Sequence, residues 1–130
     1  MPKTQPSPKR PSSLRQRLRQ LRTPVADLDL EQLRRFCASL PDVTPIAEAV
    51  ARQQVRVVGE IASVRIVPRA GSPSLEATVN DGSAALVIVW TGRRHIAGIS
   101  PGRRLTLAGR GNPSGPAGRL TFFNPDYELL

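Results

Sequence analysis

Arginine is the residue type in this chain with the most obvious chemistry. The 130 residues include 19 lysines and arginines against 10 aspartates and glutamates, which gives a formal net charge of +9 at pH 7. Lys3 and Lys9 are the only lysines, so guanidinium groups carry almost all of the positive charge. Because a guanidinium group pairs with phosphate oxygens and stacks on bases, this composition indicates a polyanionic partner. Biased codon usage in the genome is the alternative explanation of the same composition.

Six arginines are the candidate contacts with such a partner, because they flank the strands and loops that we expect in the second half of the chain. They are Arg65, Arg69, Arg93, Arg94, Arg110 and Arg119. Arg69 precedes the first expected loop between strands, and Arg110 and Arg119 flank the last one. Arg93 and Arg94 leave the third expected strand together. These positions bracket the groove that a small nucleic-acid-binding barrel uses.

Trp90 and Phe122 are the aromatic candidates for stacking on bases. Aromatic residues make up only 4% of the chain, so arginines must supply most of the affinity. Binding should then be weakly sequence-specific and steeply salt-dependent. Trp90 ends an apolar stretch, and burial in the core is the favoured interpretation of it. Phe122 and Phe123 face opposite sides of a regular strand, and the pattern leaves open which of them faces outward.

Catalytic and metal-binding groups are missing from the sequence pattern. Cys37 is the single cysteine and His95 the single histidine, which excludes an internal disulfide and a Cys/His metal site. No pair of carboxylates and no nucleophile beside a base stands out. We therefore expect no enzymatic activity, no metal, no cofactor and no small-molecule substrate, and we interpret Cys37 as a small buried hydrophobic residue.

Membrane insertion and secretion are also not indicated by the sequence. No apolar run approaches the ~20 residues of a membrane span, and the N-terminus has no apolar secretory segment. We expect no membrane partner. The expected location is the bacterial cytoplasm, with association with the nucleoid as a variant of that prediction.

Three consecutive strands are predicted in the middle of the chain. A β-branched run over residues 55–67 changes its alternation near Gly59, which indicates a bulge or bend there. Residues 75–80 alternate between apolar and polar side chains, and residues 85–90 are almost wholly apolar. Asp81-Gly82 between them predicts a tight hairpin with positive backbone angles.

Two further strands complete the prediction, over residues 105–109 and 120–124. A short helical turn is expected after Trp90, and residues 112–118 read as a flexible loop. Three strands, a small helical connection and two more strands are the order of an OB-fold. The predicted fold class is therefore an all-β core, a five-stranded OB-fold Greek-key barrel with an N-terminal α-helical extension.

The chain is divided into three parts by this prediction. Residues 1–26 form a flexible basic tail with a short amphipathic segment, which contacts phosphates, docks on an anionic membrane or is simply solvated, the last being favoured. Residues 27–51 form a helical extension that packs on the barrel, with one helix capped by Asp29 and a second beginning at Thr44. Residues 52–130 form the barrel.

Several short motifs resemble one known family. They are Gly59-Glu60-Ile61, Leu75-Glu76-Ala77, Asp81-Gly82-Ser83, Pro101-Gly102-Arg103 and Asn124-Pro125-Asp126-Tyr127-Glu128. In order and spacing they resemble the wedge domain of the RecG branch-migrating helicase, over roughly the last three-fifths of the chain. The resemblance implies binding of single-stranded or branched DNA. No Gly-Lys-Ser/Thr phosphate loop occurs in the sequence, so the motor activity of that family is not carried over.

Two functions are compatible with these observations. The first is a non-enzymatic module that binds nucleic acid, with DNA favoured over RNA, through the arginine-rich groove. The second is an adapter that binds a protein partner, in which the helices or an apolar outer face at Val87 and Val89 form the contact. A fold alone does not decide between them.

Overall fold

The computed structural model describes residues 29–114 and 118–130. The chain divides into two compact units, Met1–Gln32 and Leu33–Leu130, and nearly all of the described residues belong to the second. The basic tail expected over residues 1–26 lies outside the described residues and stays a prediction. Among the described helices, none combines the length and apolar character that a membrane crossing needs.

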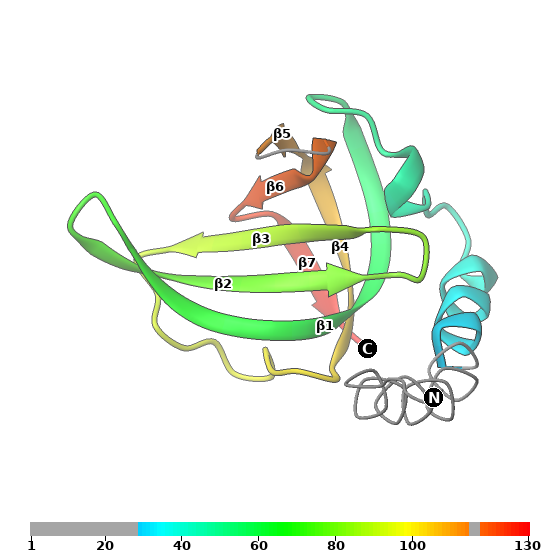
Figure 1. The fold of residues 1–130 in the computed structure, drawn as a ribbon, viewed down its shortest axis with the longest axis horizontal. Coiled ribbons are helices and arrows are strands. Elements are labelled where there is room, and N and C mark those ends of the chain that lie inside the picture. The colour runs from blue at the N-terminus through cyan, green and yellow to red at the C-terminus, as the bar shows by residue number, and fades with distance from the viewer. Residues whose placement is uncertain (1–28, 115–117) are drawn as a thin grey trace, which may run out of the picture. The chain divides into compact units, whose positions relative to one another are not determined.

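The second unit is built on a single curled β-sheet (Figure 1). Its strands, with their bounds, are β1 (Gln54–Arg69), β2 (Ser72–Asn80), β3 (Ala85–Thr91), β4 (Arg104–Arg110), β5 (Asn112–Pro113), β6 (Leu120–Phe123) and β7 (Asp126–Leu129). Their order in the sheet is β5-β6-β3-β2-β1-β4-β7. Neighbouring strands are antiparallel, except that β6 runs parallel to β3.

The sheet curls into a barrel-like shape because β4 and β5 are separated by Gly111 alone. β4 pairs with β1, whereas β5 pairs with β6, so the two ends of the sheet meet at this point. A Cβ atom on Gly111 would lie 2.9 Å from the Phe122 ring, closer than real Cβ contacts allow. Glycine at this position therefore lets the chain cross over the core and close the sheet.

The described strands number more than the five expected. Residues 112–113 form β5 where we expected only a loop, and Asp126–Leu129 form β7, beyond the last strand that we expected. Both are short strands that find a partner, β6 and β4, only when the sheet has curled. The all-β core is confirmed, and the strand count of five is wrong for the described residues.

The core lies inside the curled sheet and follows the alternation of the strands. Its most deeply buried side chains include Phe122, Ile61, Leu86, Ile88, Leu105 and Leu107. On β2, Leu75, Ala77 and Val79 join this core, which leaves Glu76 and Thr78 on the outer face of the sheet. The alternation predicted for residues 75–80 is therefore confirmed.

The bend in β1 has a different origin from the one expected at Gly59. The register between β1 and β2 shifts between Ile61 and Ser63, so the bulge lies at Ala62. Gly59 is needed for a close approach instead, because a Cβ atom there would lie 2.5 Å from a side-chain atom of Val79. The bulge then turns the outer half of β1 so that Arg65 faces outward.

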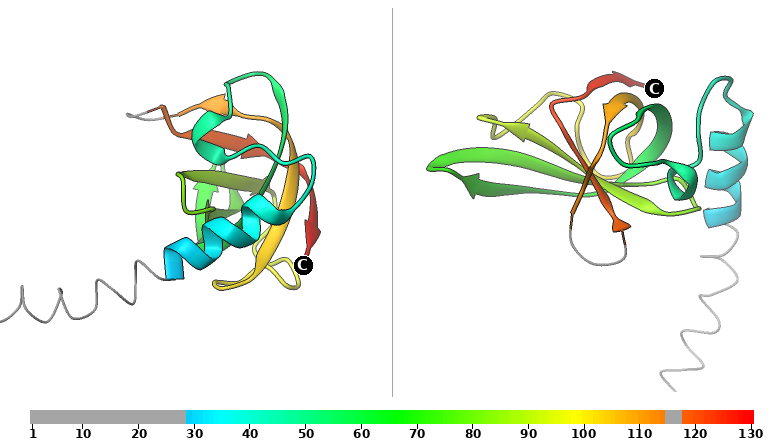
Figure 2. Two further views of the ribbon diagram at one scale, coloured as in Figure 1. Left: turned by 90° about the vertical axis from the view of Figure 1, so that its right-hand side faces the viewer. Right: turned by 90° about the horizontal axis from the view of Figure 1, so that it is seen from above.

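The tight turn of the sheet joins β1 to β2 rather than β2 to β3. Ala70 and Gly71 form this two-residue connection, with φ of 50° and 81°. Both values are positive, as a type I′ hairpin requires. The β1–β2 hairpin extends beyond the rest of the curled sheet (Figure 1 and Figure 2). The connection between β2 and β3 is a four-residue hairpin loop, residues 81–84, in which Gly82 has a φ of 89°. The predicted hairpin and the positive angle at Gly82 are confirmed, whereas the tight two-residue turn at Asp81-Gly82 is wrong.

The helical extension is shorter than predicted. Residues 29–39 are helical, and the region expected to form a second helix from Thr44 contains only the single 3-10 turn η1 (Ile46–Glu48). Leu33 and Cys37 pack against Val58, on the face of β1 that points away from the main core. Burial raises the pKa of the Cys37 thiol from its ordinary value of 9.0 to about 11, with a further contribution from the Asp81 carboxylate. This supports the expectation that Cys37 is a buried hydrophobic residue.

Candidate nucleic-acid interface

Four of the six candidate arginines lie near one another at one end of the sheet. Arg65 and Arg69 stand on the outer half of β1, which pairs with the first half of β2. The end of β3 pairs with the same part of β2, and the Gly92 backbone N–H donates to the Pro73 carbonyl at 2.9 Å. Arg93 and Arg94 follow at once in the chain. These four arginines therefore come from segments that lie close together at the base and side of the β1–β2 hairpin.

Arg65 and Arg69 are both bound to one carboxylate, that of Glu76. Arg65 donates to Oε1 from Nη2 at 3.1 Å and from Nε at 3.3 Å, and Arg69 donates to Oε2 from Nη2 at 2.9 Å. The Glu76 side chain is 9% exposed, whereas those of Arg65 and Arg69 are 74% and 42% exposed. The carboxylate thus lies beneath the two guanidinium groups, which present their positive charge to solvent.

The exposed aromatic ring of this face belongs to Phe123, not to either of the two predicted aromatics. Phe123 is 43% exposed and Phe122 is 1% exposed, so β6 turns Phe122 into the core. The Arg69 guanidinium lies over the Phe123 ring, 5.6 Å from its centroid. Together they cover Val89, the cross-strand neighbour of both Glu76 and Phe123, which is fully buried. The prediction of Phe122 as a stacking residue is wrong.

Trp90 is buried and therefore does not contribute to the surface of the interface either. It is 5% exposed, and its ring meets that of Tyr127 edge-on, with 5.5 Å between the ring centroids. Trp90 pairs with Leu75, whose side chain points into the core. The favoured interpretation of Trp90 as a core residue is confirmed, and its place among the nucleic-acid contacts is wrong.

Arg93 and Arg94 lie in the segment after β3, in turns and bends rather than in the short helix we expected. Both are exposed. Arg93 Nη2 donates only a long hydrogen bond, 3.4 Å, to the His95 carbonyl, and Arg94 has no side-chain partner within the described part of the chain. Their guanidinium groups are therefore available to a ligand, whereas Arg65 and Arg69 use some of their donors on Glu76.

Arg110 and Arg119 lie toward the opposite end of the sheet. β6 runs parallel to β3 with Val87 opposite Thr121, which places Arg119 level with the beginning of β3. At a rise of ~3.3 Å per residue, roughly 20 Å separates that level from the end of β3. Arg110 donates to the Arg52 carbonyl at 3.3 Å. The predicted groove is thus one group of four arginines and a separate pair, not a continuous line.

Two buried carboxylates are not indicated by the sequence pattern. Glu76 is one of the polar residues in the alternation over residues 75–80, and Asp81 belongs to an expected turn. Asp81 is 4% exposed, and its Oδ2 accepts from the Ile46 backbone N–H at 2.8 Å. The available signal for Glu76 is the pair Arg65 and Arg69 on the preceding expected strand, because a buried carboxylate needs charged partners.

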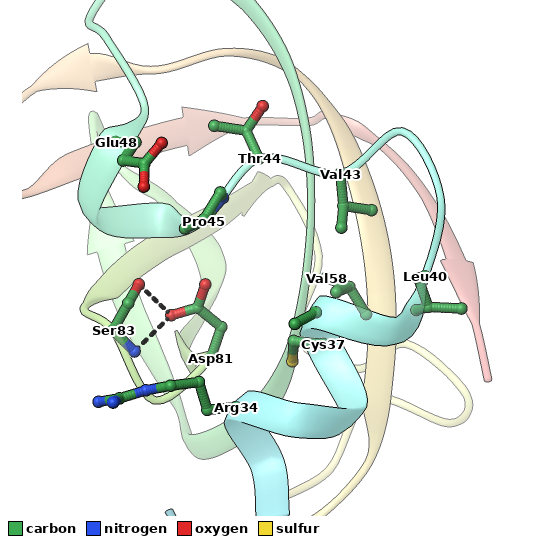
Figure 3. Close-up of a pocket in the computed structure, with 11 residues that line it drawn as sticks. Arg34, Cys37, Leu40, Val43, Thr44, Pro45, Glu48, Val58, Asp81 and Ser83 are labelled. Atoms are coloured by element: carbon green, nitrogen blue, oxygen red, sulfur yellow. Dashed lines mark hydrogen bonds between the residues drawn. The ribbon is translucent and has the colours of Figure 1, made fainter. Parts of the chain in front are cut away.

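A cavity of about 500 Å³ lies on the other side of β1 (Figure 3). Cys37, Leu40, Val43 and Val58 contribute much of its apolar wall. Asp81 lies in its polar wall, where its carboxylate accepts hydrogen bonds from Ser83. Over the described residues, no three His, Cys, Asp or Glu side chains gather as a metal site would require.

The comparisons with known proteins bear on the fold. No protein-family model and no curated protein matches the chain. The structure of RecG bound to a three-way DNA junction matches with a TM-score of 0.55 at 15% identity, over 68% of this chain and 12% of that chain. A structure described as structural mimicry for functional antagonism matches with a TM-score of 0.50 at 15% identity, over 66% of this chain and 44% of that chain.

A third structure, the Ifi202 HINa domain in complex with 20-bp double-stranded DNA, has a TM-score of 0.49 at 13% identity, over 68% of this chain and 46% of that chain. This chain thus spans less than half the length of each of the three. At such identities the likeness concerns the fold alone. The expected resemblance to RecG is confirmed at that level, and the fold is OB-like.

Proposed function

We propose that this protein is a non-enzymatic nucleic-acid-binding module, with single-stranded or branched DNA as its favoured ligand. The OB-like fold that it shares with part of RecG supports the proposal, since that structure was solved with a three-way DNA junction. OB-folds commonly bind oligonucleotides across the second and third strands. Here Arg65 and Arg69 on β1 and Phe123 on β6 flank the outer face of β2 and β3, and Arg93 and Arg94 follow the end of β3.

The observation that carries the proposal is the exposed Phe123 ring within a group of outward-facing arginines. A single-stranded nucleic acid offers unpaired base faces and a row of phosphates. Phe123 supplies a ring for one base, and Arg65, Arg69, Arg93 and Arg94 supply positive charge around it. Neutralising phosphates releases counterions, so these arginines give affinity that falls with rising salt.

The position of Arg119 indicates the direction in which a bound strand would run across the sheet. A strand that leaves the Phe123 region along β3 and β6 reaches Arg119 after roughly 13 Å, because four residues separate the two at ~3.3 Å each, and this distance is within the several nucleotides that one OB-fold covers. Arg119 is exposed and its side chain has no partner within the described residues. We therefore expect Arg119 to contact a phosphate a few nucleotides away from the stacked base.

A double substitution tests the arginine contribution. Arg93→Ala/Arg94→Ala should weaken binding of a fluorescein-labelled single-stranded DNA about tenfold or more. The slope of log affinity against log salt should also become shallower by one to two phosphate contacts, at about 0.7 per contact for a single strand. The matched control is Arg34→Ala/Arg56→Ala, which removes the same charge from side chains that hydrogen-bond the Gly82 and Pro41 carbonyls elsewhere. Equal losses in both variants would contradict a localised interface.

Phe123→Ala separates stacking from charge. It should weaken binding of single strands by roughly fivefold or more, because stacking on an aromatic ring stabilises each base by about 1–3 kcal/mol. The salt dependence should not change, since no charge is removed. Titrations of single-stranded, duplex and three-way-junction DNA, and of RNA, at two salt concentrations measure both effects and identify the favoured ligand.

The protein-adapter alternative retains one supporting feature. Of its expected apolar outer face, Val89 is fully buried under the arginine–phenylalanine layer and Val87 is half-buried. The cavity of about 500 Å³ beside Cys37 remains as an apolar recess for a protein side chain. This alternative requires a discrete protein complex that survives Arg93→Ala/Arg94→Ala and is lost when Val43 is replaced by Asp in the cavity wall.

A further inference from the structure

Glu76 occupies a position where a negative charge should oppose binding of nucleic acid. It lies on the outer face of β2, within the proposed interface, between Arg65 on β1 and Val89 on β3. Simple electrostatics would favour a neutral residue there, because a carboxylate repels phosphate. Its burial beneath two arginines points to a different role.

The geometry directs the arginines outward while hiding the carboxylate. Three guanidinium nitrogens, Arg65 Nε and Nη2 and Arg69 Nη2, donate to the two Glu76 oxygens. A guanidinium group carries five N–H donors, so most donors of the pair remain free for a ligand. Arg65 Nη1, Arg69 Nε and Arg69 Nη1 have no acceptor among the described residues. Arg65 and Arg69 are therefore held in position by Glu76 and still have N–H groups that can donate to a ligand.

Fixing the arginines in advance lowers the cost of binding. A free arginine side chain has many rotamers, and a ligand that immobilises it must overcome the lost entropy. Arg69 is held twice, by the Glu76 carboxylate and by the Phe123 ring. The stacking surface and the phosphate-binding groups thus share one rigid layer, which is the arrangement that preorganised binding sites use.

We propose that Glu76 is a positioning residue that holds Arg65 and Arg69 beside Phe123 as one preformed nucleotide subsite. The inference rests on the proposed function. The base of an unpaired nucleotide stacks on the Phe123 layer, and its flanking phosphate accepts from the free arginine donors. Glu76 touches no part of the ligand and acts only through the two guanidinium groups.

Glu76→Gln tests the proposal because the two explanations predict opposite changes in affinity for DNA. Loss of a positioning residue should weaken binding, whereas removal of a negative charge should strengthen it. Glutamine has the same shape, but its amide N–H₂ would face the Arg69 donor and release that side chain. We expect binding of a fluorescein-labelled 12-nucleotide oligothymidylate to weaken about fivefold although the protein gains positive charge. The control is Glu60→Gln, which removes an equal charge from the Arg104 ion pair, 3.1 Å long, and should leave affinity unchanged or slightly higher.

A double-mutant cycle separates positioning from damage to the fold. In an Arg65→Ala/Arg69→Ala background, Glu76→Gln should no longer weaken binding, because the groups it positions are gone. A loss that persists in this background overturns the inference, since it would come from the fold. Binding of Glu76→Gln equal to or tighter than wild type also overturns it and leaves the proposed function standing. If wild type binds none of the DNA probes, the proposed function falls and the inference falls with it.

Discussion

Two buried carboxylates lie on β2 and the loop that follows it, Glu76 on the side of the β1–β2 hairpin and Asp81 on the side of the β2–β3 loop, and they differ in what they bind. Glu76 is 7% exposed and Asp81 is 4% exposed, so burial alone does not distinguish them. The donors to Glu76 are two arginine side chains that reach into solvent. The donors to Asp81 are the backbone N–H groups of Ile46, Ser83 and Ala84 and the Ser83 hydroxyl.

The two carboxylates serve different ends: one is expected to contribute to the stability of the fold and the other to binding of the ligand. Asp81 links the β2–β3 loop to η1, thirty-five residues earlier in the chain, and so holds backbone segments together. Glu76 links only side chains on one face of the sheet. A carboxylate that holds backbone should matter most to folding, whereas one that holds exposed side chains should matter most to the ligand.

The largest expected effect in this comparison is that of Asp81→Ala on stability. It leaves the Ile46, Ser83 and Ala84 backbone donors without their acceptor in a buried site. We expect the free energy of unfolding, measured with urea, to fall by about 3 kcal/mol. Asp126→Ala on the exposed β7 strand is the control and should change it by less than about 0.5 kcal/mol. A loss below about 1 kcal/mol for Asp81→Ala would contradict its structural role.

The next largest expected effect is on the pH dependence of stability, to which the Cys37 thiol near Asp81 contributes. Burial and the nearby Asp81 raise the pKa of the thiol from 9.0 to about 11. The unfolded chain therefore loses this proton at lower pH than the folded chain, and stability falls as pH rises from about 9 towards 11. The slope is at most about 1.4 kcal/mol per pH unit.

Cys37→Ala is the matched variant for this effect. Its unfolding free energy should lack the decrease assigned to the thiol when urea titrations at pH 8 and pH 10.5 are compared. Other groups that titrate in this range are present in both proteins and cancel in the difference. An identical pH dependence in the two proteins would show that folding does not shift the Cys37 pKa.

The smallest expected effect is on stability and comes from the turn of the β1–β2 hairpin, on the Glu76 side of β2. Ala70 is exposed and has φ of 50°, a region that asparagine tolerates better than alanine. Ala70→Asn should raise the free energy of unfolding by about 0.5–1 kcal/mol, measured by thermal or urea unfolding. Ala70→Val should lower it, because a β-branched residue is strained at positive φ. The reverse order of the two variants would exclude the type I′ turn.

The alternation along the strands was readable from the sequence. Leu75, Ala77 and Val79 face the core as their spacing predicts. The choice between Phe122 and Phe123 was not readable, because two adjacent aromatics fit either orientation of a strand. It depends on β6 lying parallel to β3 in a particular register, which is a contact between segments far apart in the chain.

The sequence by itself determined the all-β core and the arginine-rich character of the surface, because both follow from local patterns and composition. The tertiary structure alone decided that Glu76 lies beneath Arg65 and Arg69 and that Asp81 reaches Ile46. A carboxylate has the same local sequence signal whether it faces water or a guanidinium group. What distinguishes these cases is the curling of the sheet, which brings distant donors within hydrogen-bonding distance.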